Sequence, residues 1–347
     1  MATEIPNTTF VEDSDTPFEI NILYAIFIPL LSFFTIVGNL LILLAFWKVP
    51  SLRDKPSELL ILNLSCIDLI TGSVVLPFWA PVYITPGYWP FGEIGCLLAV
   101  IPVNITIHAS LYTLLAISVD RLLLVGCEYP QYMKLQSRHR VRITIIGCWI
   151  FAMLIWILEA GLWNYAKKLD YTAANIDFSK SCLSPPRRVK TYSLTVFISL
   201  FFTPVMTVVG LSSAFLYFLR RRLKKTKTSG MSQPASSVQP QTPSNQEPTS
   251  SSTQGQASST NKNRYIKPAV SLLILVFAMA ICMLPYCFYV MIIELFCETC
   301  NSLVVIYAVF LLQFCNACLD PFLYGLTQRK IRRFYCTCLG NNRVQAT

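Results

Sequence analysis

The sequence predicts an all-α membrane protein in which seven helices cross the bilayer as a bundle. Seven apolar stretches run along the chain, each longer than the about 20 residues that a helix needs to span ~30 Å of hydrocarbon. Only 13% of the residues are charged, against about a quarter in soluble proteins, and the mean hydropathy is +0.53. Because backbone groups cannot stay unpaired in lipid, we expect these stretches to be helices.

The first three spans each carry a polar side chain that lipid alone would not tolerate. Asn39 lies in the first span, Asp68 in the second, and Asp120-Arg121 ends the third. An ionisable group in a span costs about 2.5–3.5 kcal/mol on insertion scales, so it usually faces the bundle interior. We therefore expect a buried polar core. The seven spans are residues 21–47, 58–84, 94–125, 140–164, 190–219, 266–296 and 302–325.

The later spans are marked by Trp149 in the fourth, Pro204 in the fifth, Pro285 in the sixth and Asp320-Pro321 in the seventh. Each proline should kink its helix, and neighbouring helices in a bundle can absorb the freed carbonyl groups. Residues 327–338 then predict a short amphipathic helix on the inner membrane surface. Its cysteines, Cys336 and Cys338, are candidates for palmitoylation.

Basic residues predict the orientation of the bundle. With the N-terminus outside, all but six of the 28 lysines and arginines fall on the cytoplasmic side, as the positive-inside rule expects. The six lie between the fourth and fifth spans. Three regions follow: an extracellular tail (1–20) with a glycosylation sequon at Asn7, a seven-span domain (21–325), and a cytoplasmic tail with the amphipathic helix (326–347).

Residues 228–263, between the fifth and sixth spans, are dominated by Ser, Thr, Gln, Pro and Asn. Such a segment cannot bury enough apolar surface to offset its ordering entropy, so it is expected to be disordered. A flexible linker is favoured over a phosphorylated regulatory segment, although both interpretations stay open.

Eight sequence features, each on the expected helix, resemble those of the rhodopsin-like (class A) family of G-protein-coupled receptors. Between Tyr24 and Cys338 they are Gly38-Asn39, Asn63 to Asp68, Trp89 to Gly92 with Cys96, Ser118 to Arg121, Trp149, Pro204, Cys282 to Pro285, and Asn316 to Tyr324. The sequence around Trp149 and Trp156 is also similar to that of aminergic receptors.

The resemblance implies a plasma-membrane receptor, not an enzyme, that binds an extracellular ligand in the bundle and activates heterotrimeric G proteins. Arrestin and a receptor kinase are implied as further partners. The residues implied in coupling are Asp120, Arg121 and Tyr324, and a disulfide is implied between Cys96 and Cys182. The chain departs from the family pattern at Leu122, Ser212, Tyr265 and Met283, which weakens the expected resting lock on the arginine.

The polar core contains two carboxylates with amide and hydroxyl neighbours at mid-membrane depth. Oxygen ligands suit a hard cation, so a Na⁺ or proton site is expected, with a water-filled hydrogen-bond network as the alternative. The candidate residues are Asn39, Asp68, Ser110, Asn316 and Asp320.

The ligand pocket is expected to be aromatic and apolar, with a few neutral polar groups. Its expected walls are Val103, Asn104, Ile107, His108, Met283, Tyr286, Val290, Phe310 and Phe314. His108 is more often a satisfied polar residue of the bundle than a ligand contact. Val103 stands where aminergic receptors place an aspartate, so a small apolar or weakly acidic molecule, or a peptide, is favoured. An amine receptor using Glu159 or Glu294 as counter-ion is the alternative.

Other classes fit less well. The seventh span has no lysine for a retinal Schiff base, and only His108 could serve a zinc hydrolase from within a span. No catalytic constellation converges, nucleic acid is not expected, and a seven-span transporter would usually show internal repeats. Cys297 and Cys300 form a CxxC that is more readily a small loop disulfide than a metal or redox site.

Overall fold

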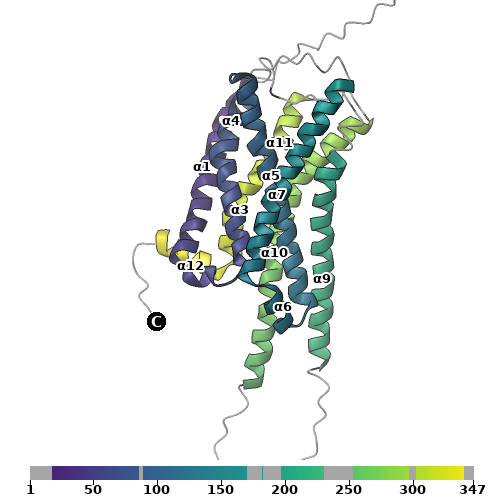
Figure 1. Ribbon diagram of the computed structural model, residues 1–347. Coiled ribbons are helices and arrows are strands. Elements are labelled where there is room, and N and C mark those ends of the chain that lie inside the picture. The colour runs from purple at the N-terminus through teal and green to yellow at the C-terminus, as the bar shows by residue number, and fades with distance from the viewer. Residues whose placement is uncertain are drawn as a thin grey trace, which may run out of the picture.

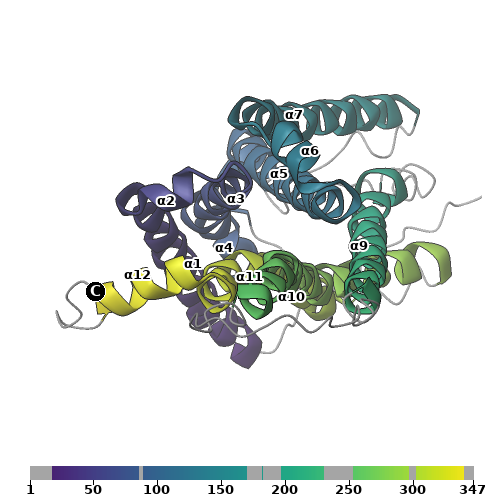
Figure 2. The same cartoon turned by 90° about the horizontal axis from the view of Figure 1, so that it is seen from below.

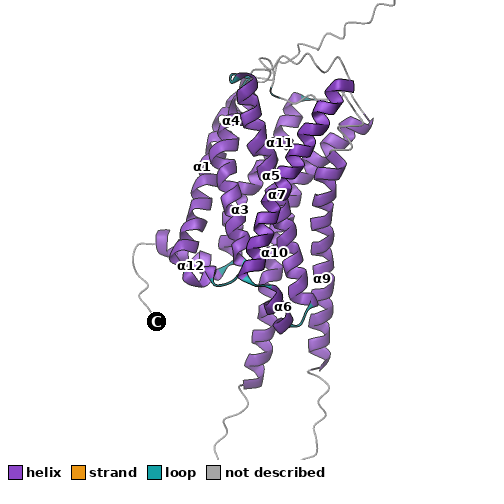
Figure 3. Ribbon diagram, in the orientation of Figure 1, coloured by secondary structure: helices purple, strands orange, loops and turns teal. Residues whose placement is uncertain are grey.

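The computed structural model describes residues 18–85, 89–169, 182, 197–229, 253–296 and 302–339. Within this part of the chain the regular structure is helical and contains no strand (Figure 3). Seven helical stretches there are long and apolar enough to cross a membrane. The prediction of a seven-helix membrane bundle is therefore confirmed.

The spans follow the predicted order. They are α1 (Phe18–Lys48), α3 (Glu58–Ile70) with η1 (Thr71–Val75) and α4 (Leu76–Ile84), α5 (Gly92–Gly126), α7 (Arg138–Leu169), η4 (Phe197–Phe202) with α9 (Thr203–Ser229), α10 (Thr253–Phe296) and α11 (Leu303–Thr327). Three shorter helices, α2 (Pro50–Arg53), α6 (Tyr129–Leu135) and α12 (Arg329–Leu339), lie at one end of the bundle (Figure 1).

The helices form a ring that closes where α1 meets α11 (Figure 2). α5 contacts α3, α7, α9 and α10, and so holds the two halves of the ring together.

The predicted amphipathic helix is α12, which lies across the end of the bundle (Figure 1). Its Ile331 is fully buried, Lys330 Nζ donates to the carbonyl of Ser51 at 2.9 Å, and Tyr335 Oη donates to the carbonyl of Pro321 at 3.2 Å. Burial raises the pKa of the Tyr335 phenol, so the hydroxyl stays protonated and keeps donating.

Two π-helical segments stand just before prolines. η1 precedes Pro77 and η4 precedes Pro204. A proline cannot donate to the carbonyl four residues earlier, and the helix takes a wider, π-helical turn next to each of them. The hydroxyl of Ser32 on α1 donates to the Gly72 carbonyl at 2.6 Å, and Thr203 Oγ1 donates to the Ile198 carbonyl at 2.7 Å.

Helix occupies both ends of the segment expected to be disordered. α9 continues to Ser229 and α10 begins at Thr253, inside the range 228–263. Propagating an existing helix costs far less than nucleating one, so polar residues can extend the ends of spans that are already helical. Residues 230–252 lie outside the described residues, as does the first part of the predicted fifth span, 190–196.

Candidate functional site

Two buried carboxyl groups meet in the centre of the bundle. Asp68 on α3 and Asp320 on α11 are 2% and 1% exposed and interact directly. Asn39 on α1 donates from Nδ2 to the carbonyls of Thr35 at 3.0 Å and Ala317 at 3.1 Å, which ties α1 to α11 beside Asp320. Asn316 is buried one helical turn before Asp320. No hydrogen bond joins Ser110 to the two carboxyl groups among the described residues, although Ser110 is buried on α5.

The polar core is rich in oxygens that need a donor or a cation. Buried oxygens without a hydrogen-bond partner among the described residues include six in this core: Asn39 Oδ1, Ser65 Oγ, Asp68 Oδ2, Asn316 Oδ1, Asp320 Oδ2 and Tyr324 Oη. Such atoms suit a hard cation or ordered water. In the described chain, no three His, Cys, Asp or Glu residues lie together so that they could hold a metal ion, so a cation would rely on one carboxylate pair plus neutral oxygens. The donor set fits Na⁺ in its chemistry.

Asn63 joins three helices beside this core. Its Nδ2 donates to Thr113 Oγ1 on α5 at 2.9 Å, and its Oδ1 accepts from Trp149 Nε1 on α7 at 2.9 Å. The amide therefore uses both of its ends between helices. The sequence marks Asn63 and Trp149 separately but does not predict that they pair.

On α5, the predicted ligand residues turn out largely buried. Val103, Ile107 and His108 are buried and Asn104 is partly so. Asn104 Nδ2 donates to the Val100 carbonyl at 3.0 Å, and His108 Nδ1 lies 2.8 Å from the Asn104 carbonyl. Both contacts are made within α5 itself. They agree with His108 as a hydrogen-bonded polar residue of the bundle rather than a ligand contact.

Aromatic rings connect four elements at the same end of the bundle as the disulfide. Tyr286 on α10 lies 5.6 Å from Phe310 on α11, and Phe310 lies 5.3 Å from Phe314, measured between ring centroids. Trp79 on α4 and Phe197 on η4 extend the cluster at 6.0 Å from Phe310 and 6.2 Å from Tyr286. The predicted set includes the first three rings but misses Trp79 and Phe197.

The other two predicted residues of α10, Met283 and Val290, also face the core. Met283 is buried and Val290 packs against the core with Tyr286. Tyr289, on a neighbouring face, instead exchanges hydrogen bonds with Ser302 at the start of α11, donating to its carbonyl and accepting from its amide at 3.1 Å each. The tyrosine thus holds α10 against α11.

Gln313 on α11 is a further polar residue that sequence reasoning missed. It is 4% exposed, and neither its Oε1 nor its Nε2 has a hydrogen-bond partner among the described residues. It directly precedes Phe314. An unpaired buried amide costs about 1–3 kcal/mol in a folded protein.

At the opposite end, Arg121 lies inside the bundle. Its Nη1 is 3.2 Å from Asp120 Oδ2, and the arginine side chain is 9% exposed. Tyr132 on α6 donates to Asp120 Oδ1 at 3.1 Å. Burial and then the Asp120 carboxylate raise the pKa of Tyr132, which keeps this donor protonated. Tyr324 is fully buried on α11.

Arg222 on α9 caps the end of α5. Its Nη1 donates to the carbonyls of Val125 at 2.6 Å and Cys127 at 2.9 Å, where the helix leaves carbonyls without intrahelical donors. The same two helices also meet through the hydroxyls of Ser118 and Ser212, 3.4 Å apart. Ser212 thus meets a hydroxyl of α5 at the position where the resemblance implies a tyrosine.

The disulfide expected between Cys96 and Cys182 is present, with 5.3 Å between the Cα atoms. It links Cys182, which lies between the fourth and fifth spans in the sequence, to the start of α5. Cys336 is exposed on α12, and the backbone of Cys338 is helical there. Asn7, Cys297 and Cys300 lie outside the described residues, and the side chains of Glu159 and Glu294 are not described.

Two comparisons with known proteins bear on this arrangement. Residues 38–324 match the family described as 7 transmembrane receptor (rhodopsin family). The alpha-1A adrenergic receptor of Cavia porcellus is 26% identical over 328 residues, which cover 90% of this chain and 67% of that receptor.

Proposed function

Because the chain belongs to the rhodopsin family of seven-transmembrane receptors, we propose that it binds an extracellular ligand within the bundle and activates heterotrimeric G proteins at the other end. The observation that carries the proposal is Arg121, a buried guanidinium paired with Asp120 beside α6. Burying a guanidinium carries a desolvation cost, of which the Asp120 carboxylate offsets a part. We place the protein in the plasma membrane with its N-terminus outside, and a receptor kinase and arrestin are proposed as further partners.

Basal nucleotide exchange tests coupling without a known ligand. The reconstituted receptor is combined with members of the main G-protein families, and nucleotide exchange is measured for wild type, Arg121→Ala and Arg140→Ala. Arg140 is exposed on α7 and serves as the control. Exchange should be lost only with Arg121→Ala. Full exchange by Arg121→Ala would show that another residue carries the coupling role. Transport of a substrate across the vesicle membrane would instead favour a transporter.

For the ligand, we favour a small apolar or weakly acidic molecule, or a peptide that uses the outer loops. The support is the aromatic cluster around Phe310 and the buried Val103 where an amine would need a counter-ion. An amine is the second candidate, favoured by the likeness to an adrenergic receptor. A potent monoamine response that Glu159→Gln or Glu294→Gln removes would establish the amine and name its counter-ion.

Asp68 and Asp320 are proposed to hold a Na⁺ ion between α3 and α11 in the inactive packing of these helices. The neutral oxygen donors would be Asn39, Ser110 and Asn316. The ion would offset the charge of two carboxylates that otherwise repel in a low-dielectric interior. A cation that binds one packing better than another shifts the population toward that packing.

A further inference from the structure

Glu58, the first residue of α3, carries a carboxylate that the sites described above do not use. It begins the face of α3 that Ile61, Ser65 and Asp68 continue at steps of three and four residues, and these three side chains are at most 2% exposed. The carboxylate therefore starts a face that points into the bundle. Its Oε2 atom is buried and has no hydrogen-bond partner among the described residues.

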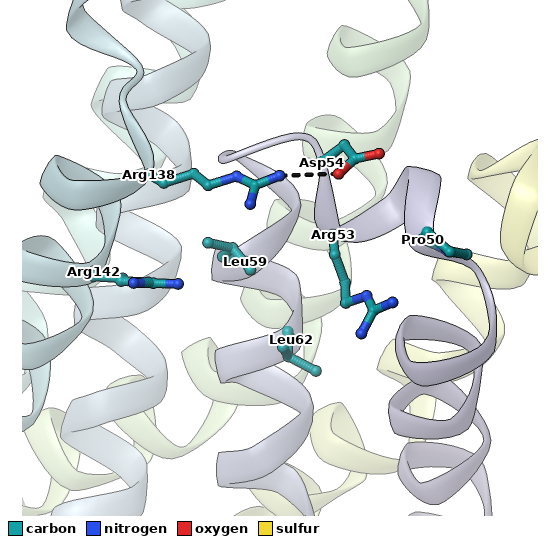
Figure 4. A pocket seen from close by; sticks show the side chains of 7 residues that line it. All are labelled: Pro50, Arg53, Asp54, Leu59, Leu62, Arg138 and Arg142. Atoms are coloured by element: carbon teal, nitrogen blue, oxygen red, sulfur yellow. Dashed lines mark hydrogen bonds and ion pairs between the residues drawn. The ribbon is translucent and has the colours of Figure 1, made fainter.

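The charged residues on the outer side of α3 do not pair with Glu58. A pocket between α2, α3 and α7 has Leu59 and Leu62 in its lining together with Arg53, Arg138 and Arg142, and Glu58 is not part of that lining (Figure 4). Arg138 Nη2 already pairs with Asp54 Oδ1 at 2.9 Å. Within the part of the chain that the structure describes, no ion pair includes Glu58. A partner for its carboxylate is therefore expected on the interior side of α3.

Arg121 lies at nearly the same depth in the bundle as Glu58. Consecutive spans run in opposite directions, and Asn63 of α3 bonds to Thr113 of α5 at 2.9 Å. Glu58 precedes Asn63 by five residues and Arg121 follows Thr113 by eight, so they lie about 7.5 Å and about 12 Å beyond this bond along their helices. The difference, about 4.5 Å, is less than one helical turn, and the long arginine side chain can span it.

Two interactions place Glu58 beside the pair formed by Asp120 and Arg121. Its carboxylate interacts electrostatically with that of Asp120, and the neighbouring Ser57 interacts with the tyrosine of α6 that donates to Asp120 Oδ1. Glu58 also interacts with Tyr324 on α11, whose Oη has no hydrogen-bond partner in the described chain. Glu58 is therefore near the coupling residues of both α5 and α11.

The contact between Arg121 and Asp120 leaves the guanidinium incompletely paired. Arg121 Nη1 is 3.2 Å from Asp120 Oδ2, yet this oxygen has no hydrogen-bond partner among the described residues, so the contact is an ion pair without an aligned hydrogen bond. Arg121 Nε is likewise buried and unpaired there. A guanidinium pairs most strongly through two parallel N–H bonds to one carboxylate. Arg121 therefore keeps a donor for a second acceptor.

We propose that Glu58 is a coupling residue, the second carboxylate with which Arg121 pairs when it leaves Asp120. The exchange replaces one carboxylate by another, so the buried guanidinium is paired before and after it. Without Glu58 the released guanidinium would stay unpaired in a low-dielectric interior, which is strongly unfavourable. The role in signalling rests on the proposed coupling through Arg121, whereas the pairing is a property of the folded chain.

Melting temperatures of the purified full chain in detergent test the pairing. With Asp120→Asn, Glu58 should take over the guanidinium, so the melting temperature should fall only slightly. The double variant Asp120→Asn/Glu58→Gln leaves Arg121 without a carboxylate, and its fall should exceed the sum of the two single falls. The matched control is Asp120→Asn/Glu128→Gln, whose falls should add, since Glu128 is an exposed acid that precedes α6.

Additive falls for Glu58 as well would overturn the proposal. Glu58 would then be an acid that stabilises the start of α3 through the helix dipole alone. A double variant that does not fold, while both single variants do, is the extreme case of a fall beyond the sum and supports the pairing.

Basal nucleotide exchange with members of the main G-protein families tests the role in coupling. Glu58→Gln should lower exchange several-fold, and Glu128→Gln should match wild type. Glu58→Asp keeps the charge at the start of α3 on a shorter side chain and should retain part of the exchange. Unchanged exchange in Glu58→Gln would overturn the coupling role. No exchange by wild type with any family would instead refute the proposed function, while the melting temperatures still decide the pairing.

Discussion

Asn63 and Gln313 are both buried amides on membrane-spanning helices, but their surroundings differ. Asn63 is bonded to Thr113 and Trp149, whereas neither polar atom of Gln313 has a partner among the described residues. Removing a bonded amide leaves its partners unpaired, while removing an unpaired one relieves a desolvation cost. The two residues therefore contribute to stability with opposite sign.

We expect Gln313→Leu to stabilise the purified receptor by about 1 kcal/mol and Asn63→Leu to destabilise it by a similar amount, since interhelical hydrogen bonds in membranes contribute roughly 0.6 kcal/mol on average and up to ~1.7 kcal/mol. Thermal unfolding in detergent measures both. If Gln313 contacts the ligand, its leucine variant will also lose agonist potency. A Gln313→Leu protein that melts earlier than wild type would show that the amide is already satisfied.

Asp68 is expected to confer sensitivity to sodium. Asp68→Asn removes one of the two carboxylates, so the dependence of basal nucleotide exchange on Na⁺ should flatten. Exchange measured in Na⁺ and in a bulky organic cation at equal ionic strength isolates the ion effect. Asp54→Asn, in an exposed loop outside the core, is the control and should keep the dependence. If nucleotide exchange by the wild-type protein does not depend on Na⁺, the core holds a network of water molecules rather than an ion.

At the scale of helices, close approach sets the tolerance to substitution. A Cβ on Gly38 of α1 would lie 2.9 Å from the Pro321 ring of α11, whereas one on Gly147 of α7 would meet nothing within 4 Å. The proline ring is rigid and cannot move aside without shifting the helix.

Gly38→Ala should therefore lower the stability of the receptor by about 1–2 kcal/mol, because overpacking exceeds the gain in helix propensity. Gly147→Ala has only the propensity gain, up to about 1 kcal/mol, and should melt at the same or a higher temperature. Comparing the two melting temperatures cancels effects common to both substitutions. Equal shifts would mean that α1 and α11 separate easily.

Arg222 joins α9 to α5 and should hold these helices in the resting arrangement. Charge-assisted hydrogen bonds contribute about 1.5–3 kcal/mol, so Arg222→Gln should raise basal nucleotide exchange several-fold. The adjacent Arg221 is exposed and provides the matched control, Arg221→Gln. If Arg222→Gln leaves basal nucleotide exchange unchanged, the arginine only caps the end of α5.

Apolar runs predicted the spanning helices because burial in lipid demands length and hydrophobicity, both readable locally. Apolar runs do not predict helices, or ends of helices, that lie outside the membrane. They missed α6 entirely and placed the start of the sixth helix at 266, whereas α10 begins at Thr253. The π-helical segments were also missed, since Pro77 and Pro204 predict a kink but not the form that the widened turn takes.

For the whole molecule, the Cys96–Cys182 bridge covalently joins the segment between the fourth and fifth spans to α5. Cys96→Ala should reduce surface expression strongly, given that losing a native disulfide typically costs about 2–5 kcal/mol. Cys66→Ala removes an exposed free thiol and is the control. Surface labelling of intact cells compares the two. Normal trafficking of Cys96→Ala would show that the loop needs no covalent anchor.

The candidate site was predictable as a set of residues but not as a set of contacts. Asn63 with Trp149, and Arg222 with the end of α5, join positions far apart in the chain, and their pairing depends on how the helices pack. Gln313 is a single polar residue in an apolar span and forms part of no sequence motif, so only its burial in the structure identifies it. Where the family pattern links two distant positions, as for Cys96 and Cys182, the contact was predicted and is present.

The length of α10 has a mechanical consequence. The helix runs unbroken over 44 residues, and about 48 Å of it separates Thr253 from Pro285. A proline is a natural pivot, because the hydrogen bond that it lacks leaves the helix easier to bend there. A swing of about 10° at this pivot would carry the far end through about 8 Å, simply as arc length on a rod of this size. A small rotation at Pro285, beside Tyr286 and Phe310, would thus reach the other end of the helix as a displacement wider than the helix's own radius.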